Sequence, residues 1–345
     1  MAVSIASLVE SADRLLEQPL LLVLLADGRL HSGEWLAAQL DVSRTAVRKG
    51  VQQLRGSGVP VLSLPRRGYR LPSRVELLDA RRIAAELGSS SQERIRRLEL
   101  KFEVDSTNTR LLGLTPPPSG SADVCISELQ HAGRGRHGRR WIQPFGAAVA
   151  LSVGWTFSDG ARSLPGLSLG VGVAVARAVK RAGASGVGLK WPNDIWLKDR
   201  KVGGVLIELR TDGRGTAHVV IGIGINVELP PAARREIEAG GVRVAAVADG
   251  CVVGPSRNLV AGAILDELLS MLAQYEREGF AAFRDAWMAL DGLRDRPVRV
   301  EMGGTAVSGT ARGVDRDGAL LLETGRGMQR FVSGEASLRL IEGDV

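Results

Sequence analysis

The chain has 345 residues, of which 44% are apolar and 24% are charged, and its formal net charge is +7. This length predicts two or three domains with enough chain to bury a sizeable core, and the composition is ordinary for a soluble globular protein. The positive charge favours anionic partners such as nucleic acid or a nucleotide.

The composition and the spacing of particular residues exclude several classes of protein. The longest apolar run, Pro19 to Ala26, is far too short to span a bilayer, and the N-terminus lacks the layout of a signal peptide. We therefore expect a cytoplasmic protein without a membrane partner. Cys125 and Cys251 form no CxxC pair, so both are expected in the core rather than in a disulfide framework or metal site. The four histidines show no metal-binding spacing either.

Residues 1–75 have the pattern of a winged helix-turn-helix domain. Ser43 is a plausible N-cap for a helix from Arg44 to Arg55, which two shorter apolar patterns precede. Residues 59–64 and 69–71 are predicted to form the strands of a hairpin with a basic tip. The polar helix face and the hairpin tip would contact DNA through Arg44, Thr45, Arg48, Lys49, Gln52, Arg66 and Arg67.

A helical protein-docking module with a basic outer face is the alternative for this domain. Residues 1–75 contain ten Lys or Arg against six Asp or Glu, and the arginines of helix and hairpin would face one side, which favours DNA binding. Gly50 is a flaw in the predicted recognition helix, because glycine costs about 1 kcal/mol there relative to alanine.

A central domain is predicted from residue 76 to 293, opening with a helix over 75–87. Ser106, Thr107 and Asn108 follow a strand-like segment, where their side chains could hydrogen-bond a neutral polar group of a ligand. In the simpler alternative, Ser106 only caps the helix that follows.

Four arginines and three glycines within residues 133–141 predict a loop that binds an anion. The glycines match the dinucleotide-binding pattern GxGxxG, but Pro144 and Gly146 prevent the helix that this motif requires. No Gly-Lys-Ser/Thr follows, as a Walker motif would need. A solvated, disordered basic loop remains the alternative.

A second group of polar motifs lies between residues 190 and 226. Pro192 leaves Asn193 and Asp194 at a turn, where an amide could read a base edge and a carboxylate could hold Mg²⁺. Two glycines at the start of a strand would let a ligand approach the backbone beside Lys201. The residues of interest are Lys190, Asn193, Asp194, Lys201, Gly204 and Asn226.

Taken in order, the motifs at 105–108, 133–139, 190–194, 200–204 and 222–226 resemble those of bifunctional biotin protein ligases that are also biotin operon repressors. The resemblance covers nearly the full length and implies an α+β protein. A winged helix-turn-helix domain would occupy residues 1–75, and a mixed α/β ligase domain of the biotin/lipoate ligase type residues 76–293. The short strands from residue 296 onwards would form a small SH3-like β-barrel, 294–345, with a role in packing or acceptor docking.

The resemblance also implies the reaction and its residues. Biotin would be activated with ATP to biotinyl-AMP and then transferred to a lysine of a biotin carboxyl carrier protein. The catalytic cations would be Arg134, Arg136 and Lys201. Biotin would be bound by Ser106, Thr107, Asn108, Gln130, Arg134, Gly135, Arg136, Lys201 and Gly204. The nucleotide would contact Arg139, Lys190, Asn193 and Asn226, and Asp194 would hold Mg²⁺.

This sequence departs from the family pattern at two positions. His137 stands in the loop where another arginine is expected, and the segment after Gly241 has Val242 and Val244 but no tryptophan that could cover an adenylate.

The partners implied by the resemblance are the carrier protein, operator DNA and a second copy of the chain when biotinyl-AMP is bound. Two other functions stay open. One is a lipoate-type protein ligase, although Ser106, Thr107 and Gln130 suit a ureido ring better than a dithiolane. The other is a ligand-responsive repressor without ligase activity.

Overall fold

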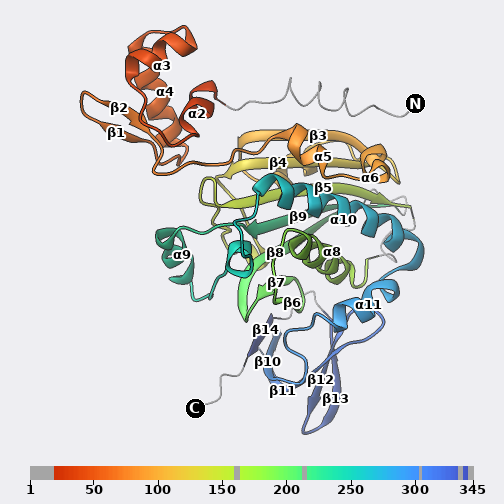
Figure 1. Cartoon of the computed structure of the whole chain (residues 1–345). Coiled ribbons are helices and arrows are strands. Elements are labelled where there is room, and N and C mark those ends of the chain that lie inside the picture. Colours follow the sequence, from red (N-terminus) through yellow and green to blue (C-terminus); the bar gives the residue numbers. More distant parts are fainter. Residues whose placement is uncertain (1–18, 159–163, 212–215, 303–304, 333–336, 341–345) are drawn as a thin grey trace.

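The computed structural model describes residues 19–158, 164–211, 216–302, 305–332 and 337–340. Its three parts follow one another from the N-terminal helices through a central sheet to a small β domain (Figure 1). The predicted first and third domains extend into residues 1–18, 333–336 and 341–345, which lie outside the described residues. Within the described ranges, no helix is both long and apolar enough to cross a membrane.

The N-terminal part is a winged helix-turn-helix, as predicted. The serines before its second and third helices accept hydrogen bonds from the backbone N–H groups of Trp35 and Ala46, which fixes where these helices begin. The wing is tied to the segment between the first two helices, because His31 pairs with Tyr69. The elements are α2 (Leu20–Leu25), α3 (Gly33–Leu40), α4 (Arg44–Gly56), β1 (Leu62–Leu64) and β2 (Gly68–Arg70).

Gly50 has a packing role that the sequence alone did not indicate. A Cβ atom at this position would lie 2.9 Å from Cδ2 of Leu21. The missing side chain therefore lets α2 pack closely on α4, and this contact offsets the low helix propensity of glycine.

A seven-stranded mixed sheet forms the middle of the protein, and α8 (Leu167–Arg181) and α10 (Arg257–Glu278) pack together beside it (Figure 1). Among the strand pairs in the described residues of this sheet, β3–β4 is parallel and the others are antiparallel. In spatial order the strands are β3 (Ile95–Val104), β4 (Ala122–Gln130), β5 (Ala148–Phe157), β9 (Ala217–Asn226), β8 (Arg200–Thr211), β7 (Asp194–Leu197) and β6 (Val187–Lys190).

The prediction of a helix over residues 75–87 is wrong for the first half of that range. Helix α5 spans only Ala80–Ala85, and α6 (Ser89–Arg94) begins after Gly88. The preceding residues are held in a non-helical conformation by distant partners. The Leu78 N–H donates to Glu128 Oε1 at 2.6 Å, and the Asp79 N–H donates to Asn258 Oδ1 at 2.7 Å. These long-range contacts override the local helical pattern.

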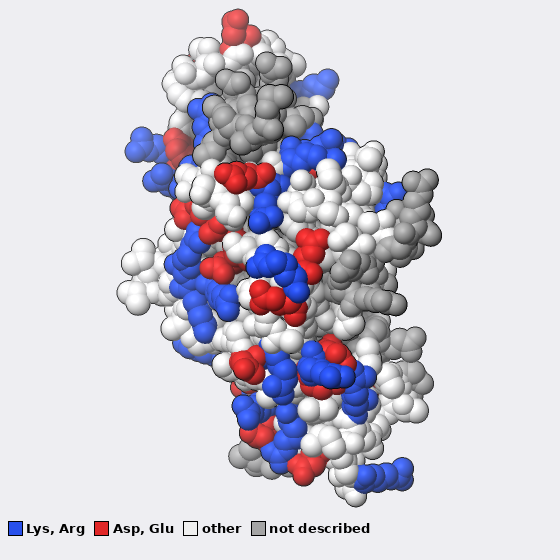
Figure 2. All heavy atoms as spheres, turned by 90° about the vertical axis from the view of Figure 1, so that its right-hand side faces the viewer, with Lys and Arg blue, Asp and Glu red and all other residues white. Residues whose placement is uncertain are grey.

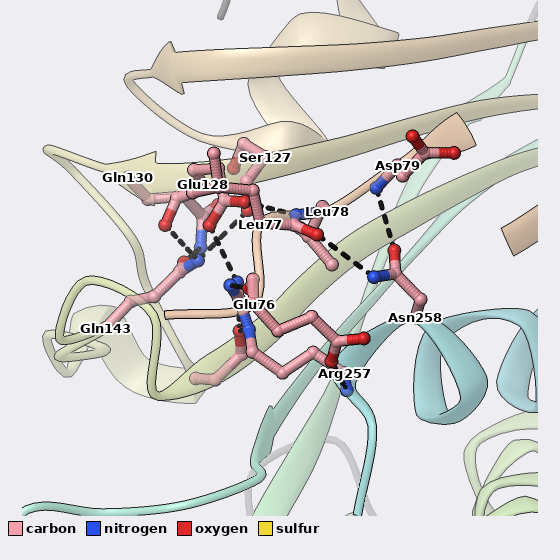
Figure 3. A network of polar contacts seen from close by, with 11 residues as sticks. Glu76, Leu77, Leu78, Asp79, Ser127, Glu128, Gln130, Gln143, Arg257 and Asn258 are labelled. Carbon is pink, nitrogen blue, oxygen red and sulfur yellow. Dashed lines mark hydrogen bonds and ion pairs between the residues drawn. The ribbon is translucent and has the colours of Figure 1, made fainter. Parts of the chain in front are cut away.

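A buried ion pair fastens this segment to the sheet. Arg257 Nη2 lies 2.8 Å from Glu128 Oε2, and the two side chains are 4% and 0% exposed. Arg257 also donates to the carbonyl oxygens of Ala148 and Glu76. Figure 3 shows this network between the start of α10, the end of β4 and the segment before α5. Because the charges are paired and hydrogen-bonded on several sides, their burial is tolerated.

The C-terminal part confirms the prediction of a small antiparallel β domain. The indole N–H of Trp191, in the central domain, donates to the Gly318 carbonyl of the C-terminal domain at 3.1 Å. The central and C-terminal domains share one continuous apolar core. Its strands run in the order β13 (Gly327–Phe331), β12 (Leu320–Thr324), β11 (Thr305–Val314), β10 (Pro297–Met302) and β14 (Ser337–Leu340), and α11 (Ala281–Met288) precedes them. Basic and acidic side chains are interspersed on the face shown in Figure 2.

Replacing Arg257 with Met should lower the free energy of unfolding by about 3 to 5 kcal/mol, because the Glu128 carboxylate would stay buried without its cation. Urea denaturation followed by circular dichroism would measure the change. Arg277→Met is the control, since Arg277 and Glu278 are 65% and 47% exposed and such surface pairs contribute at most about 1 kcal/mol. Equal losses in both variants would contradict a special role of the buried pair.

Candidate active site

A cleft of about 470 Å³ opens between the arginine loop and the ends of β4, β8 and β9. The turn between β6 and β7 and the start of α7 (Thr107–Leu112) complete its walls. Every residue predicted to bind biotin, nucleotide or Mg²⁺ lies in its lining. These residues are Ser106, Thr107, Asn108, Gln130, Arg134, Gly135, Arg136, Arg139, Lys190, Asn193, Asp194, Lys201, Gly204 and Asn226.

The arginine loop forms a closed hairpin. The Trp141 N–H donates to the Gly133 carbonyl at 2.8 Å, and the Gly135 N–H donates to the Arg139 carbonyl at 2.7 Å. At the tip, His137 adopts a left-handed φ of 55°. The described loop therefore has a defined backbone path, unlike the solvated, disordered loop considered as an alternative.

Polar side chains on the cleft floor bond to one another. Ser106 caps α7 by accepting from the Thr109 N–H, and it also lines the cleft, so its contact with a ligand stays a prediction. Ser152 lies 2.7 Å from Thr107 Oγ1 and 2.5 Å from Asn108 Oδ1. Asn108 in turn donates to Glu208 Oε2 at 2.7 Å. The floor thus presents small groups held in fixed directions.

Two cations of the cleft are held by carboxylates. Arg134 Nη2 lies 3.0 Å from Glu208 Oε1, and Lys201 Nζ lies 2.6 Å from Asp194 Oδ1. Burial lowers the pKa of the Arg136 guanidinium, although Asp194 nearby acts in the opposite direction. Arginine stays charged even so, and a partly desolvated guanidinium attracts an anion more strongly than an exposed one does.

Glycines on β9 let two side chains approach the sheet closely. A Cβ atom on Gly222 would lie 2.3 Å from Asn108 Oδ1, and one on Gly224 would lie 2.6 Å from the Trp141 ring. The indole nitrogen of Trp141 is buried without a hydrogen-bond partner in the described residues. Trp141 therefore packs closely against Gly224 of the sheet and forms part of the cleft lining.

The opposite wall is formed by α9 (Pro231–Glu238) and the segment after it. Val242 and Val244 both line the cleft, and Lys201 forms a parallel bridge with Val244. Asn226 Nδ2 donates to the Ala245 carbonyl at 3.2 Å, whereas its Oδ1 is buried and lacks a partner among the described residues. A buried acceptor without a donor is a place where a ligand N–H would be favourable.

Two predicted nucleotide contacts are already engaged with the protein. Asn193 donates to the Val205 carbonyl at 2.8 Å and lies 3.5 Å from Arg136 Nη1, while the Lys190 ammonium lies 5.0 Å from the centre of the Trp196 ring. Both side chains still border the cleft.

The sequence reasoning missed several residues of the site, namely Trp141, Gln143, Ser152 and Glu208. Trp141 ends the glycine-arginine motif and could have been singled out on that ground. The other three belong to segments whose composition is ordinary for strands and loops. Only the fold brings them into hydrogen-bonding distance of residues that line the cleft.

Metal ligands are sparse in the part of the chain that the structure describes. No group of three or more His, Cys, Asp or Glu side chains gathers there in a way that could hold a metal ion. Cys125 is buried, and burial raises the pKa of its thiol to about 12. Cys251 is partly buried, so the prediction of a core position is met fully only by Cys125.

The predicted DNA contacts lie apart from the cleft, on the N-terminal domain. All seven side chains are exposed, on α4 and on the tip between β1 and β2: Arg44, Thr45, Arg48, Lys49, Gln52, Arg66 and Arg67. Arg44 pairs with Glu34 at 2.9 Å, and both side chains are largely exposed.

Comparison with known proteins agrees with this geometry. Residues 101–226 match the Biotin/lipoate A/B protein ligase family, residues 295–339 the biotin protein ligase C-terminal domain, and residues 16–70 a helix-turn-helix domain. The solved structure of a biotin protein ligase from Aquifex aeolicus in complex with biotin and ATP superposes with a TM-score of 0.59 at 27% identity. It covers 71% of this chain and 100% of its own.

Fold and cleft together define a protein ligase of the biotin/lipoate class that carries an N-terminal helix-turn-helix domain. The chain is 39% identical to the bifunctional ligase/repressor BirA of Salmonella typhimurium, over 94% of this chain and 98% of that protein. The BirA protein of Escherichia coli is 38% identical, over 93% and 97%. The chain belongs to the BirA-type biotin protein ligase family.

Replacing Gly224 with Ala should weaken biotin and ATP binding about tenfold or more. The added methyl group would push the Trp141 ring towards the cleft, and strain of about 1.4 kcal/mol already corresponds to a factor of ten. Isothermal titration calorimetry would give the affinities. Gly325→Ala is the control, since no described heavy atom lies within 4 Å of its Cβ position. Unchanged affinity in the Gly224 variant would show that Trp141 does not shape the binding cleft.

Proposed function

We propose that this ligase works in two steps within the cleft. The carboxylate of biotin attacks the α-phosphorus of ATP and pyrophosphate leaves, which yields biotinyl-AMP. A lysine amine of a biotin carboxyl carrier protein then attacks the acyl carbon, AMP leaves and the amine loses a proton. The observation that carries the proposal is the convergence of five separate sequence motifs on one cleft. Positioning and charge stabilisation would supply the rate, without a covalent protein nucleophile.

Biotin would lie over the hydrogen-bonded floor. Its ring would contact Ser106, Thr107, Asn108 and Gln130, and its carboxylate would lie near Arg134, Gly135, Arg136, Lys201 and Gly204. Support comes from the burial of the floor residues and from the two carboxylate-held cations, which an incoming anion would bind in place of Glu208 and Asp194. Arg134, Arg136 and Lys201 would stabilise the charge that builds on the phosphate oxygens.

ATP would occupy the part of the cleft next to α9. Arg139, Lys190, Asn193 and Asn226 would contact it, and the unpaired Asn226 Oδ1 suits an amino group such as that of adenine. Asp194 would contribute one oxygen to Mg²⁺. A single protein carboxylate is enough for an Mg²⁺ ion that is bound mainly by phosphates, which agrees with the sparse acidic groups described in the cleft.

The second part of the proposal is a DNA-binding repressor with biotinyl-AMP as corepressor. Its support is the helix-turn-helix domain with seven exposed residues, in a chain whose full-length relatives are named ligase/repressors. A homodimer formed with biotinyl-AMP bound would place two such domains on an operator. The proposed domain limits are 1–75, 76–293 and 294–345, and the proposed location is the cytoplasm, where ATP and operator DNA are found.

Replacing Lys201 with Ala should reduce biotin-dependent ATP–pyrophosphate exchange roughly a hundredfold to a thousandfold, which is typical when a charge-stabilising group is removed from a transition state. Radiolabelled pyrophosphate would measure the exchange. Lys180→Ala, on the exposed side of α8, should leave it unchanged. Full activity of the Lys201 variant would refute its assigned role. In the wild-type protein, exchange that depends on lipoate would instead favour a lipoate-type ligase, and the absence of exchange with either acid would favour a repressor without ligase activity.

Operator binding should tighten at least tenfold when biotinyl-AMP is present. Gel shifts with a DNA duplex selected from a random pool by the liganded protein would test this, and equal affinity in both states would rule out the corepressor role. Arg48→Ala and Arg67→Ala should each weaken binding and lower the salt dependence by about one unit per lost phosphate contact.

A further inference from the structure

Gln143 lies just behind the cleft, in the irregular segment that leads from the arginine loop to β5. Its side chain is buried, with 8% of the residue exposed. Its Nε2 group donates to the backbone carbonyls of Ser127 and Glu128 at 3.1 and 3.0 Å, and its Oε1 accepts from Gln130 Nε2 at 3.0 Å. Figure 3 shows this amide between the Gln130 side chain and the backbone of Ser127 and Glu128 on β4. The side chain therefore closes the base of the loop.

These partners leave Gln143 a single sensible amide orientation. If the amide were reversed, its oxygen would face two carbonyl oxygens, and three acceptors would meet without a donor. The nitrogen must therefore point to the backbone of β4 and the oxygen to Gln130. The nearest group of Gln130 must then be its Nε2, because only a donor satisfies the Gln143 oxygen.

This orientation turns the oxygen of Gln130 towards the floor of the cleft. Gln130 Oε1 accepts from the Thr107 N–H at 2.9 Å and lies 3.3 Å from Thr107 Oγ1. The contact between the Thr107 hydroxyl and Gln130 can be replaced, because Ser152 Oγ lies only 2.7 Å from Thr107 Oγ1. The Thr107 hydroxyl can donate to Ser152 Oγ, while the Ser152 hydroxyl donates to Asn108 Oδ1. One lone pair of Gln130 then becomes available to a donor on the ligand.

We infer that Gln143 is a positioning residue that fixes Gln130 with its oxygen towards the cleft, so that the site selects a ring bearing N–H groups. The inference rests on the proposed role of Gln130 in biotin binding. A ureido ring supplies the N–H, whereas a dithiolane has none and would leave the buried acceptor unpaired. Sites built around such polar groups discriminate strongly against ligands that lack the partner.

Gln143→Ala should raise KM for biotin about tenfold in the ATP–pyrophosphate exchange reaction, while KM for ATP and kcat change less than about twofold, since the substitution acts on the ring site. Gln143→Met keeps the side-chain volume and should give the same pattern, so it can replace the alanine variant if that one folds poorly. Thermal melting of each variant with and without biotin would establish that the protein is folded.

A double-mutant cycle separates positioning from general structural damage. In a Gln130→Ala background, Gln143→Ala should raise KM for biotin less than about twofold further, because Gln143 would have nothing left to orient. A further tenfold rise would overturn the inference, as would an unchanged KM in the single variant. If the wild-type enzyme itself showed no biotin-dependent exchange, the proposed function would fail first, so the two failures are distinguishable.

Gln143→Glu adds a readout that packing alone would not produce. The new carboxylate would face the carbonyls of Ser127 and Glu128, so KM for biotin should be highest at pH 8 and fall towards pH 6, where protonation restores one donor. An effect on KM independent of pH would contradict the donor requirement. Gln92→Ala is the matched control, because Gln92 also donates to two backbone carbonyls, those of Ala84 and Leu87, but on a distant helix. It should leave KM for biotin unchanged.

Discussion

The buried pair between Glu128 and Arg257 is the constraint on which the arrangement of the protein depends. The two charges can be buried only together, and Glu128 also accepts from the backbone of Leu78. One carboxylate therefore joins the start of α10, the end of β4 and the segment that leads in from the N-terminal domain. Because the arginine loop leaves β4 two residues later, the same pair fixes where that loop begins.

The charge pattern inside the cleft follows from a second requirement. Arg134 and Lys201, which we propose to meet the anions of the ligands, are partly exposed, and in this structure Glu208 and Asp194 neutralise them. The carboxylates also hold the cations near their working positions, so less side-chain entropy is lost when a ligand binds. Part of the favourable electrostatic energy of ligand binding is offset, because the ion pair with Glu208 or Asp194 must be broken before the cation can pair with the ligand.

Local pattern was sufficient for much of the fold and for most of the site. The cap at Ser43, the short C-terminal strands and the glycine-arginine motif were visible because each depends on neighbouring residues. The helix predicted over 75–87 failed because its first residues bond to partners near residues 128 and 258, which no local window includes. Gln143 and Glu208 were missed for the same reason, since an ordinary polar residue acquires its role only from the partners that the fold brings to it.

The end of β4 explains how ligand binding and DNA binding can be linked physically. Glu128 is paired with Arg257, Leu129 belongs to the apolar cluster of the N-terminal domain, and Gln130 lines the cleft. Side chains alternate between the two faces of a strand, so Leu129 points away from the face that Glu128 and Gln130 share. Three consecutive residues here nevertheless belong to three different contacts: the buried ion pair, the N-terminal apolar cluster and the cleft. Phe102 of the adjacent strand β3 joins the same cluster. A ligand that moved the end of β4 would therefore act directly on the packing of the helix-turn-helix domain. For such coupling to occur, the ligand must bind one arrangement of this strand end more tightly than another.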